Sequence, residues 1–86
     1  MNTTTKFAEL VDRAAVYNRI ETEPPKSKSS MAREIGISRA HFYALMHARH
    51  RPLPHIQARL VRAFASMTGL KPGTVRRWLE SDWAPI

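Results

Sequence analysis

Cysteine is absent from this 86-residue chain, and acidic residues, glycine and long apolar runs are scarce. Without a thiol the chain forms no disulfide and no thiolate metal site, which fits a reducing cytoplasm. No apolar run approaches the ~20 residues of a membrane-spanning helix. The first residues carry acids where a signal peptide has its basic region. We therefore expect a cytoplasmic protein that makes no contact with a membrane.

Patterns that carry catalysis are also missing. The seven acidic residues form no pair expected in one pocket, and there is no nucleophile signature, phosphate-binding loop or metalloprotease pair. A single domain of this length buries only about 60–65% of its unfolded surface, which leaves no room for a large cofactor. We expect residues 1–86 to form one domain that is not an enzyme and that binds no cofactor or small-molecule ligand.

Positive charge is in excess, and the excess is local. The net charge is +7, from 14 lysines and arginines against seven aspartates and glutamates. Residues 1–23 carry a net charge of −1, residues 24–62 of +7 and residues 63–86 of +1. Scattered surface lysines do not cluster in this way, so the middle segment is expected to meet a polyanion.

Apolar side chains recur at intervals of three and four, which predicts an all-α protein. The expected helices cover about residues 5–20, 28–35, 38–48, 54–68 and 72–81. The first has the apolar stripe Phe7, Leu10, Val11, Ala14, Tyr17 and Ile20, with a threonine among residues 3–5 as its cap. Pro54 suits the start of the fourth helix and Gly69 its end.

Residues 28–47 are the most informative stretch. The apolar positions are Met31, Ala32 and Ile35 before a glycine, and Ile37, Phe42 and Leu45 after it. Each half predicts one buried face on a short helix, Gly36 suits a turn with positive φ, and Ser38 can cap the second helix. The small residue at Ala32 lets the second helix cross closely. This pattern is typical of a helix-turn-helix, and an ordinary helical hairpin is the other interpretation.

The stretch resembles the bipartite motif of Cro and lambda-repressor-like regulators, the Xre type. The resemblance covers roughly residues 5–80, and Arg51-Pro52 matches a basic residue and a proline often found after the motif. Pro24-Pro25 lies in a longer linker than that pattern usually has, and the linker is either a basic arm that touches DNA or a spacer. The resemblance implies a compact five-helix domain. It also implies a small transcriptional regulator of phage or plasmid repressor type, associated with the nucleoid.

A helix over residues 38–48 with Phe42 and Leu45 inward leaves one side that can enter a DNA major groove. The residues expected to read bases are Arg39, Ala40, Tyr43, Ala44 and His47. An arginine fork matches guanine, alanines permit close approach, and tyrosine reaches a base edge or a phosphate. The residues expected to hold phosphates are Lys28, Ser29, Ser30, Ser38, Arg49 and Arg51. Helix capping is the alternative role of the serines.

Four histidines lie within 15 residues and raise the question of a metal: His41, His47, His50 and His55. No carboxylate or cysteine is placed to complete the four ligands of a structural zinc site, so we expect no metal. Histidines change charge within the cellular pH range, and we expect DNA binding to strengthen at lower pH.

A weaker copy of the motif lies 33 residues further along the chain. It consists of Phe64, Ala65, Gly69, Leu70, Val75 and Trp78, with Thr68 as the mismatch. Taken literally, it places Thr74, Arg76 and Arg77 on a second reading helix. The last two helices of an Xre domain also contain a glycine turn, and the basic excess centres on the first copy. We therefore assign DNA binding to the first copy.

A domain that reads one groove segment has limited affinity, so we expect a homodimer on a palindromic double-stranded DNA site. The helix and tail over residues 72–86 would form its interface, from Trp78, Leu79, Trp83 and Ile86. Trp83 is the main candidate, and Trp78 fits the core better. Two alternatives are a protein-interaction adaptor with the same fold and a DNA-packaging or recombination accessory protein.

Overall fold

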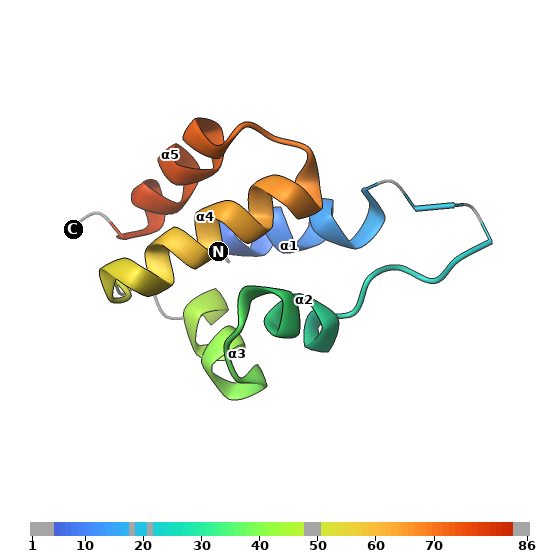
Figure 1. Ribbon diagram of the computed structural model, residues 1–86, viewed down its shortest axis with the longest axis horizontal. Coiled ribbons are helices and arrows are strands. Elements are labelled where there is room, and N and C mark those ends of the chain that lie inside the picture. The colour runs from blue at the N-terminus through green and yellow to red at the C-terminus, as the bar shows by residue number, and fades with distance from the viewer. Residues whose placement is uncertain (1–4, 18, 21, 48–50, 84–86) are drawn as a thin grey trace, which may run out of the picture.

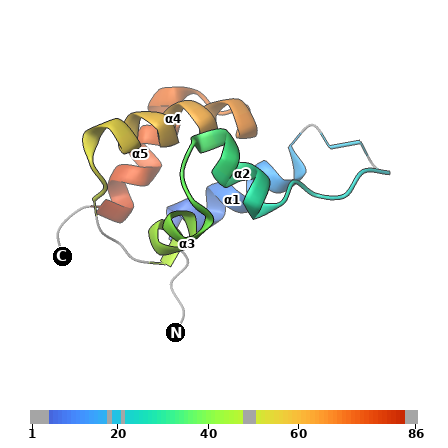
Figure 2. The same ribbon diagram turned by 60° about the horizontal axis from the view of Figure 1, so that its bottom comes forward.

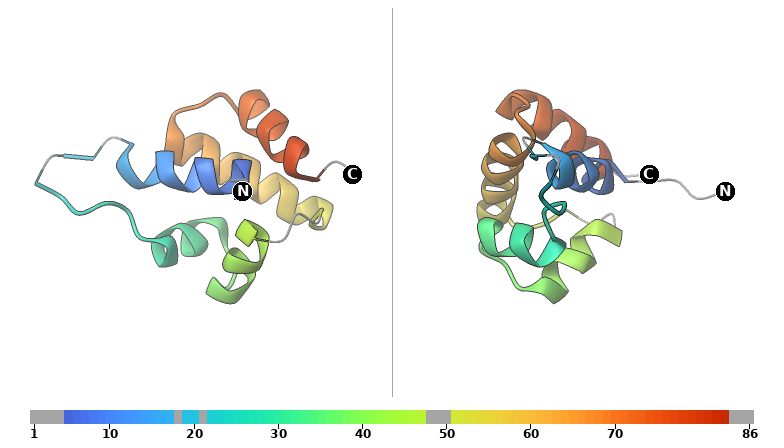
Figure 3. Two further views of the ribbon diagram at one scale, coloured as in Figure 1. Left: turned by 180° about the vertical axis from the view of Figure 1, so that it is seen from behind. Right: turned by 90° about the vertical axis from the view of Figure 1, so that its right-hand side faces the viewer.

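The computed structural model describes residues 5–17, 19–20, 22–47 and 51–83. These ranges form five helices and no strand: α1 (Lys6–Val16), α2 (Lys28–Ile35), α3 (Arg39–His47), α4 (Pro54–Thr68) and α5 (Pro72–Trp83). α1 and α4 lie side by side, with α5 on one side of them and α2 and α3 on the other (Figure 1 and Figure 3). The all-helical prediction is confirmed for these residues. None of the described helices has the length and apolarity to cross a bilayer.

One hydrophobic core joins the five helices. Its centre is a group of three phenylalanines, in which Phe7 meets Phe42 and Phe64 edge-on, with ring centroids 5.4 and 5.2 Å apart. All three rings are almost fully buried. Such aromatic pairs add about 0.5–1.5 kcal/mol beyond the area they bury. Phe7 on α1 therefore links α3 to α4, and the radius of gyration of 12.4 Å is that of a compact chain.

α1 is shorter than predicted. Thr5 caps it as expected, because its Oγ1 accepts the Ala8 N–H at 3.0 Å. The helix then ends at Val16, and Tyr17 takes extended geometry with φ −65° and ψ 131°. Tyr17 and Ile20 are 45% and 61% exposed, so their assignment to the buried stripe was wrong. Beyond the helix end, a spacing of three or four residues no longer marks one face.

The connection from α1 to α2 extends away from the helices (Figure 1) and is pinned at its base. The Lys26 N–H donates to the Ala15 carbonyl at 2.9 Å. The Lys26 ammonium pairs with the Glu34 carboxylate of α2 at 2.8 Å. These two contacts tie the connection to α1 and α2 at its base.

The C-terminal part of the chain follows the predicted boundaries closely. α4 begins at Pro54 and ends at Thr68, and Gly69 follows in the left-handed region with φ 74°. α5 begins at Pro72 as expected. Near its end, the Asp82 carboxylate accepts the Lys6 and Phe7 N–H groups at 2.8 and 2.9 Å. A carboxylate at these N–H groups stabilises the start of α1.

The surface predicted for a dimer lies largely inside the protein. α5 continues two residues past Ser81 to Trp83, which is only 6% exposed, and Leu79 is fully buried. Trp83 follows Leu79 by one turn, so a longer helix turns both toward the core. The choice of Trp83 as an interface residue was therefore wrong. Trp78 is partly buried, as preferred for it, and Ile86 lies outside the described residues.

Candidate nucleic-acid interface

Gly36 sets the geometry between α2 and α3. Its φ is 87°, and its N–H donates to the Ala32 carbonyl at 2.9 Å. The Ile37 N–H donates to the same carbonyl at 3.1 Å. The Gly36 N–H also donates to the Arg33 carbonyl at 3.2 Å, and this bond together with the one from Ile37 is typical of a Schellman cap, which needs a left-handed residue and so favours glycine. Ser38 then caps α3, because its Oγ accepts the His41 N–H at 3.0 Å.

α3 has a buried side and an outer side. The buried side consists of Phe42, Leu45 and Met46. The outer side carries the residues predicted to read bases: Arg39, Ala40, Ala44 and His47, which are exposed, and Tyr43, which is partly buried. α3 lies beside α2 at the edge of the molecule (Figure 2), and α1 and α4 lie between it and α5 (Figure 1). The structure therefore brings all five predicted residues onto the accessible part of one helix, the outer face of α3.

Tyr43 joins this face to the start of α2. Its ring packs edge-on against Phe42, with centroids 6.1 Å apart, and the Lys28 ammonium lies 5.7 Å from its centroid. An exposed cation over an aromatic ring is stabilised by about 0.5–1 kcal/mol. Lys28 and Tyr43 are thus neighbours in space, although the sequence assigned them separate roles on phosphates and bases.

The cap of α2 is a residue that the sequence analysis missed. The Ser27 Oγ accepts the Ser30 N–H at 3.1 Å, while Ser29 and Ser30 are partly buried within the helix. A serine three residues ahead of a helical N–H is the usual N-cap pattern, so the signal was present in the sequence. Ser27 therefore caps α2, the role that was the alternative for Ser29 and Ser30.

Arg51 has a partner that the sequence did not predict. Its Nη1 and Nη2 donate to the two carboxylate oxygens of Glu80 at 3.3 and 2.8 Å, and its guanidinium lies 5.8 Å from the Trp83 ring centroid. The hydrogen bond from Arg51 lowers the pKa of Glu80 below its ordinary value. A phosphate would have to compete with Glu80 for this guanidinium. Arg49, the other arginine predicted on phosphate, lies outside the described residues.

The described histidines are surface residues of two helices. His47 and His55 are exposed, His41 is partly buried, and His50 lies outside the described residues. Among the residues that the structure describes, no three histidine or acidic side chains are grouped as metal ligands.

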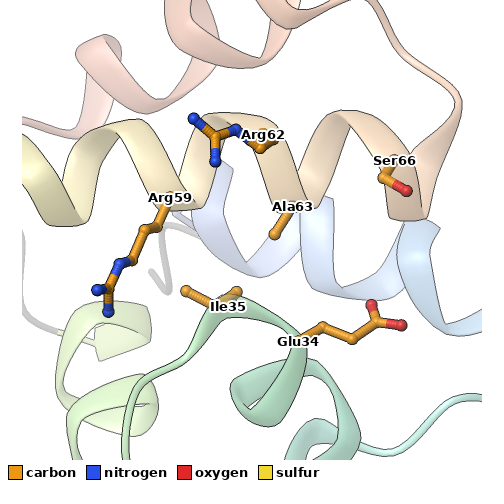
Figure 4. Close-up of a pocket in the computed structure, with 6 residues that line it drawn as sticks. All are labelled: Glu34, Ile35, Arg59, Arg62, Ala63 and Ser66. Atoms are coloured by element: carbon orange, nitrogen blue, oxygen red, sulfur yellow. The ribbon is translucent and has the colours of Figure 1, made fainter.

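A groove that was not predicted runs between the end of α2 and α4 (Figure 4). It has a volume of about 440 Å³ and is lined by Glu34, Ile35, Arg59, Arg62, Ala63 and Ser66. The Arg59 Nη1 donates to the Gly36 carbonyl at 3.2 Å, so this arginine ties α4 to the turn before α3. The α4 side of the groove follows from helical spacing, whereas its pairing with α2 depends on long-range packing.

Comparison with known proteins identifies no relative of this chain. The chain matches no protein-family model, no curated protein and no solved structure. Conclusions about its function consequently depend on the residues and geometry described above.

Proposed function

We propose that this chain is a sequence-specific, double-stranded DNA-binding transcriptional regulator. Its helix-turn-helix is α2–Gly36–α3, and α3 enters the major groove, in the manner of Xre-type repressors. The observation that supports this most is the outer face of α3, which combines an arginine, two alanines and a tyrosine beside Lys28 at the edge of the molecule. A major groove about 12 Å wide admits one helix of this kind.

Each residue of the interface has a distinct role. Arg39 lies in the first turn of α3, where its fork donates to guanine O6 and N7. Ala40 and Ala44 let the helix backbone approach the base edges, and Tyr43 contacts a base edge or a phosphate. Lys28 neutralises a phosphate next to Tyr43, and each phosphate neutralised steepens the salt dependence by ~0.9 in log–log slope.

The mode of regulation that we propose is occupancy of the site. A bound domain excludes polymerase from its site. A homodimer on a palindrome remains our expectation, with half-site centres ~34 Å apart or a multiple of it. Its contact surface must lie outside the buried Leu79 and Trp83.

Selection of bound sites from random duplex DNA, followed by sequencing, tests this function. We expect a preferred palindrome. Arg39→Ala should relax the preference at one base pair and cost about 1–3 kcal/mol there, because a bidentate base contact is lost. Lys28→Ala should weaken all sequences alike. The reverse behaviour of the two variants would contradict the assignment, and binding with no preferred sequence would instead favour a DNA-packaging or recombination role.

A protein-interaction adaptor is the second candidate, and one observation favours it. Val16 and Ile20 are apolar and more than half exposed where α1 gives way to the α1–α2 connection. Such side chains are typical of a protein contact when they gather in one place. Failure to bind duplex DNA in dilute salt would select this function over the first.

A further inference from the structure

The turn after α4 repeats the turn after α2. The corresponding positions are Ile35 and Thr68 at the helix ends, Gly36 and Gly69 at the turns, and Arg39 and Pro72 at the next helix starts. Both glycines are left-handed, with φ values of 87° and 74°. These three positions are displaced by the same 33 residues as in the sequence pattern. The second copy therefore has its left-handed glycine and its adjoining helix boundaries in the same register as the first. The turns differ in their hydrogen bonds, because the Leu70 N–H donates to the Thr68 Oγ1, whereas the Ile37 N–H donates to the Ala32 carbonyl.

Burial follows the same register in the two copies. The positions buried in both are Met31 and Phe64, Ile35 and Thr68, Phe42 and Val75, and Met46 and Leu79. Ile37 and Leu70 are partly buried at matching places. Ala65 and Trp78 are more exposed than their counterparts Ala32 and Leu45. α5 thus turns outward the same helical positions that α3 turns outward.

The outer face of α5 is cationic. The counterparts of the five predicted base-reading positions are Pro72, Gly73, Arg76, Arg77 and Glu80. Arg76 and Arg77 are exposed, as is Lys71 just before the helix, and a Cβ built on Gly73 would meet no atom within 4 Å. Within the described residues, neither Arg76 nor Arg77 forms a salt bridge.

The acids of α5 have other hydrogen-bond partners, although the charge of Arg76 also acts on Glu80 one turn away. Glu80 is held by both guanidinium nitrogens of Arg51, and the buried Asp82 is bonded to the start of α1. The face formed by Lys71, Gly73, Arg76 and Arg77 is therefore positive, open and free of a bulky side chain at its centre.

We propose that this outer face of α5 binds the phosphate backbone of a second duplex DNA segment. α3 and α5 lie on opposite sides of the α1–α4 pair, so a straight duplex seated on α3 leaves α5 uncovered (Figure 3). One chain then bridges two duplexes, and the inference rests on the proposed function for α3. Arg76 and Arg77 are adjacent and lack the alanine and tyrosine pattern of α3, so α5 contacts phosphates and reads no sequence.

A bridging assay tests the proposal. One duplex is fixed to beads, the protein is added, and capture of a second, labelled duplex is measured. The double variant Arg76→Ala/Arg77→Ala should lose capture by roughly tenfold or more, because two phosphate contacts are removed. The matched control Arg19→Ala/Arg62→Ala removes two exposed arginines from other elements and should retain capture. Circular dichroism shows whether both variants keep the fold.

Sedimentation velocity of the same variants separates bridging by α5 from bridging by a dimer with one α3 in each protomer. Capture that survives in Arg76→Ala/Arg77→Ala overturns the proposal, and so does a loss of capture that accompanies loss of a dimer. Equal losses in the arginine control overturn it as well, because the effect is then one of net charge alone.

Binding to one duplex, measured by fluorescence anisotropy, distinguishes failure of this proposal from failure of the proposed function. Ala44→Glu blocks the α3 face, and Arg76→Ala/Arg77→Ala alters the α5 face. If Ala44→Glu changes nothing while the arginine variant abolishes binding, the function assigned to α3 is wrong and the α5 surface stands. If only Ala44→Glu matters, both for one duplex and for capture, the α5 proposal fails.

Discussion

α3 and α5 each follow a left-handed glycine at the same spacing, yet they present different outer faces. α3 presents an arginine, two alanines and a tyrosine, whereas α5 presents Gly73 and two adjacent arginines. The comparison teaches that the glycine turn decides which side of the following helix faces outward. The residues on that side then decide which chemistry it meets.

The two turns are also supported differently. A Cβ on Gly36 would lie 3.5 Å from Nη1 of Arg59, a flexible side chain. A Cβ on Gly69 would lie 2.5 Å from the ring of Tyr17, which therefore packs directly on that turn. The second turn is closed by an aromatic residue from the end of α1, and the first is tied by a hydrogen bond from α4.

The largest expected effect comes from the core positions beneath the two turns. Phe42→Ala should lower the free energy of unfolding by about 3–5 kcal/mol, because it empties a fully buried site next to Phe7. The matched change Val75→Ala removes fewer atoms and should cost less, at about 0.8 kcal/mol for each buried methyl or methylene lost plus a cavity contribution. Urea unfolding measures both, and equal losses would contradict the central place of the phenylalanine group.

The next effect compares the glycines themselves. Gly36→Ala should cost about 1–2 kcal/mol, because an L-residue is strained in the left-handed region. Gly69→Ala should cost more, since the new methyl also displaces the Tyr17 ring. In a Tyr17→Ala background the two costs should become equal within about 0.5 kcal/mol. A difference that persists in that background would show that Tyr17 is not its cause.

A smaller free-energy change is expected at the DNA interface. Ala40→Glu should weaken duplex binding by roughly tenfold, or about 1.4 kcal/mol, because it adds bulk and a negative charge to the outer face of α3. Ala58→Glu makes the same chemical change at an exposed position of α4 and should leave affinity within about threefold. Electrophoretic mobility shifts at one salt concentration compare the two. Similar losses in both variants would argue against an interface on α3.

The smallest effect concerns the ion pair that links Arg51 to α5. The pKa of Glu80 is lower in the folded protein than in the unfolded chain, chiefly through its hydrogen bond from Arg51. The pair therefore contributes stability above the unfolded glutamate pKa of about 4.3, and that contribution is lost as the pH falls through the lower folded value. Urea unfolding from pH 7 to pH 3 should show a greater loss for the wild type than for Glu80→Gln. Parallel curves would contradict this.

Local features of the fold could be predicted from the sequence, because their causes lie within a few residues. The limits of α4, the glycine after it and the Ser38 cap of α3 each depend on neighbouring backbone groups. The end of α1 could not be predicted in this way, since apolar spacing continued past Val16 while the helix did not. The packing of Tyr17 on Gly69 could not be predicted either, because it joins residues that are far apart in the chain.

The candidate interface also combines local features, which could be predicted, with features that depend on helix packing, which could not. Helical periodicity placed Arg39, Ala40 and Ala44 together correctly, because one helix carries them all. The contact of Lys28 with Tyr43 and the pairing of Arg51 with Glu80 depend on how helices pack, so neither could be predicted from local spacing. The buried position of Trp83 has the same origin.

Asp82, in the last turn of α5, stabilises the first turn of α1 through two hydrogen bonds. During synthesis on a ribosome, that first turn has no carboxylate to hold it until α5 has emerged. The cap of α1 is accordingly completed only after α5 has been synthesised. Proteolytic removal of the last turn of α5 would therefore first destabilise the start of α1.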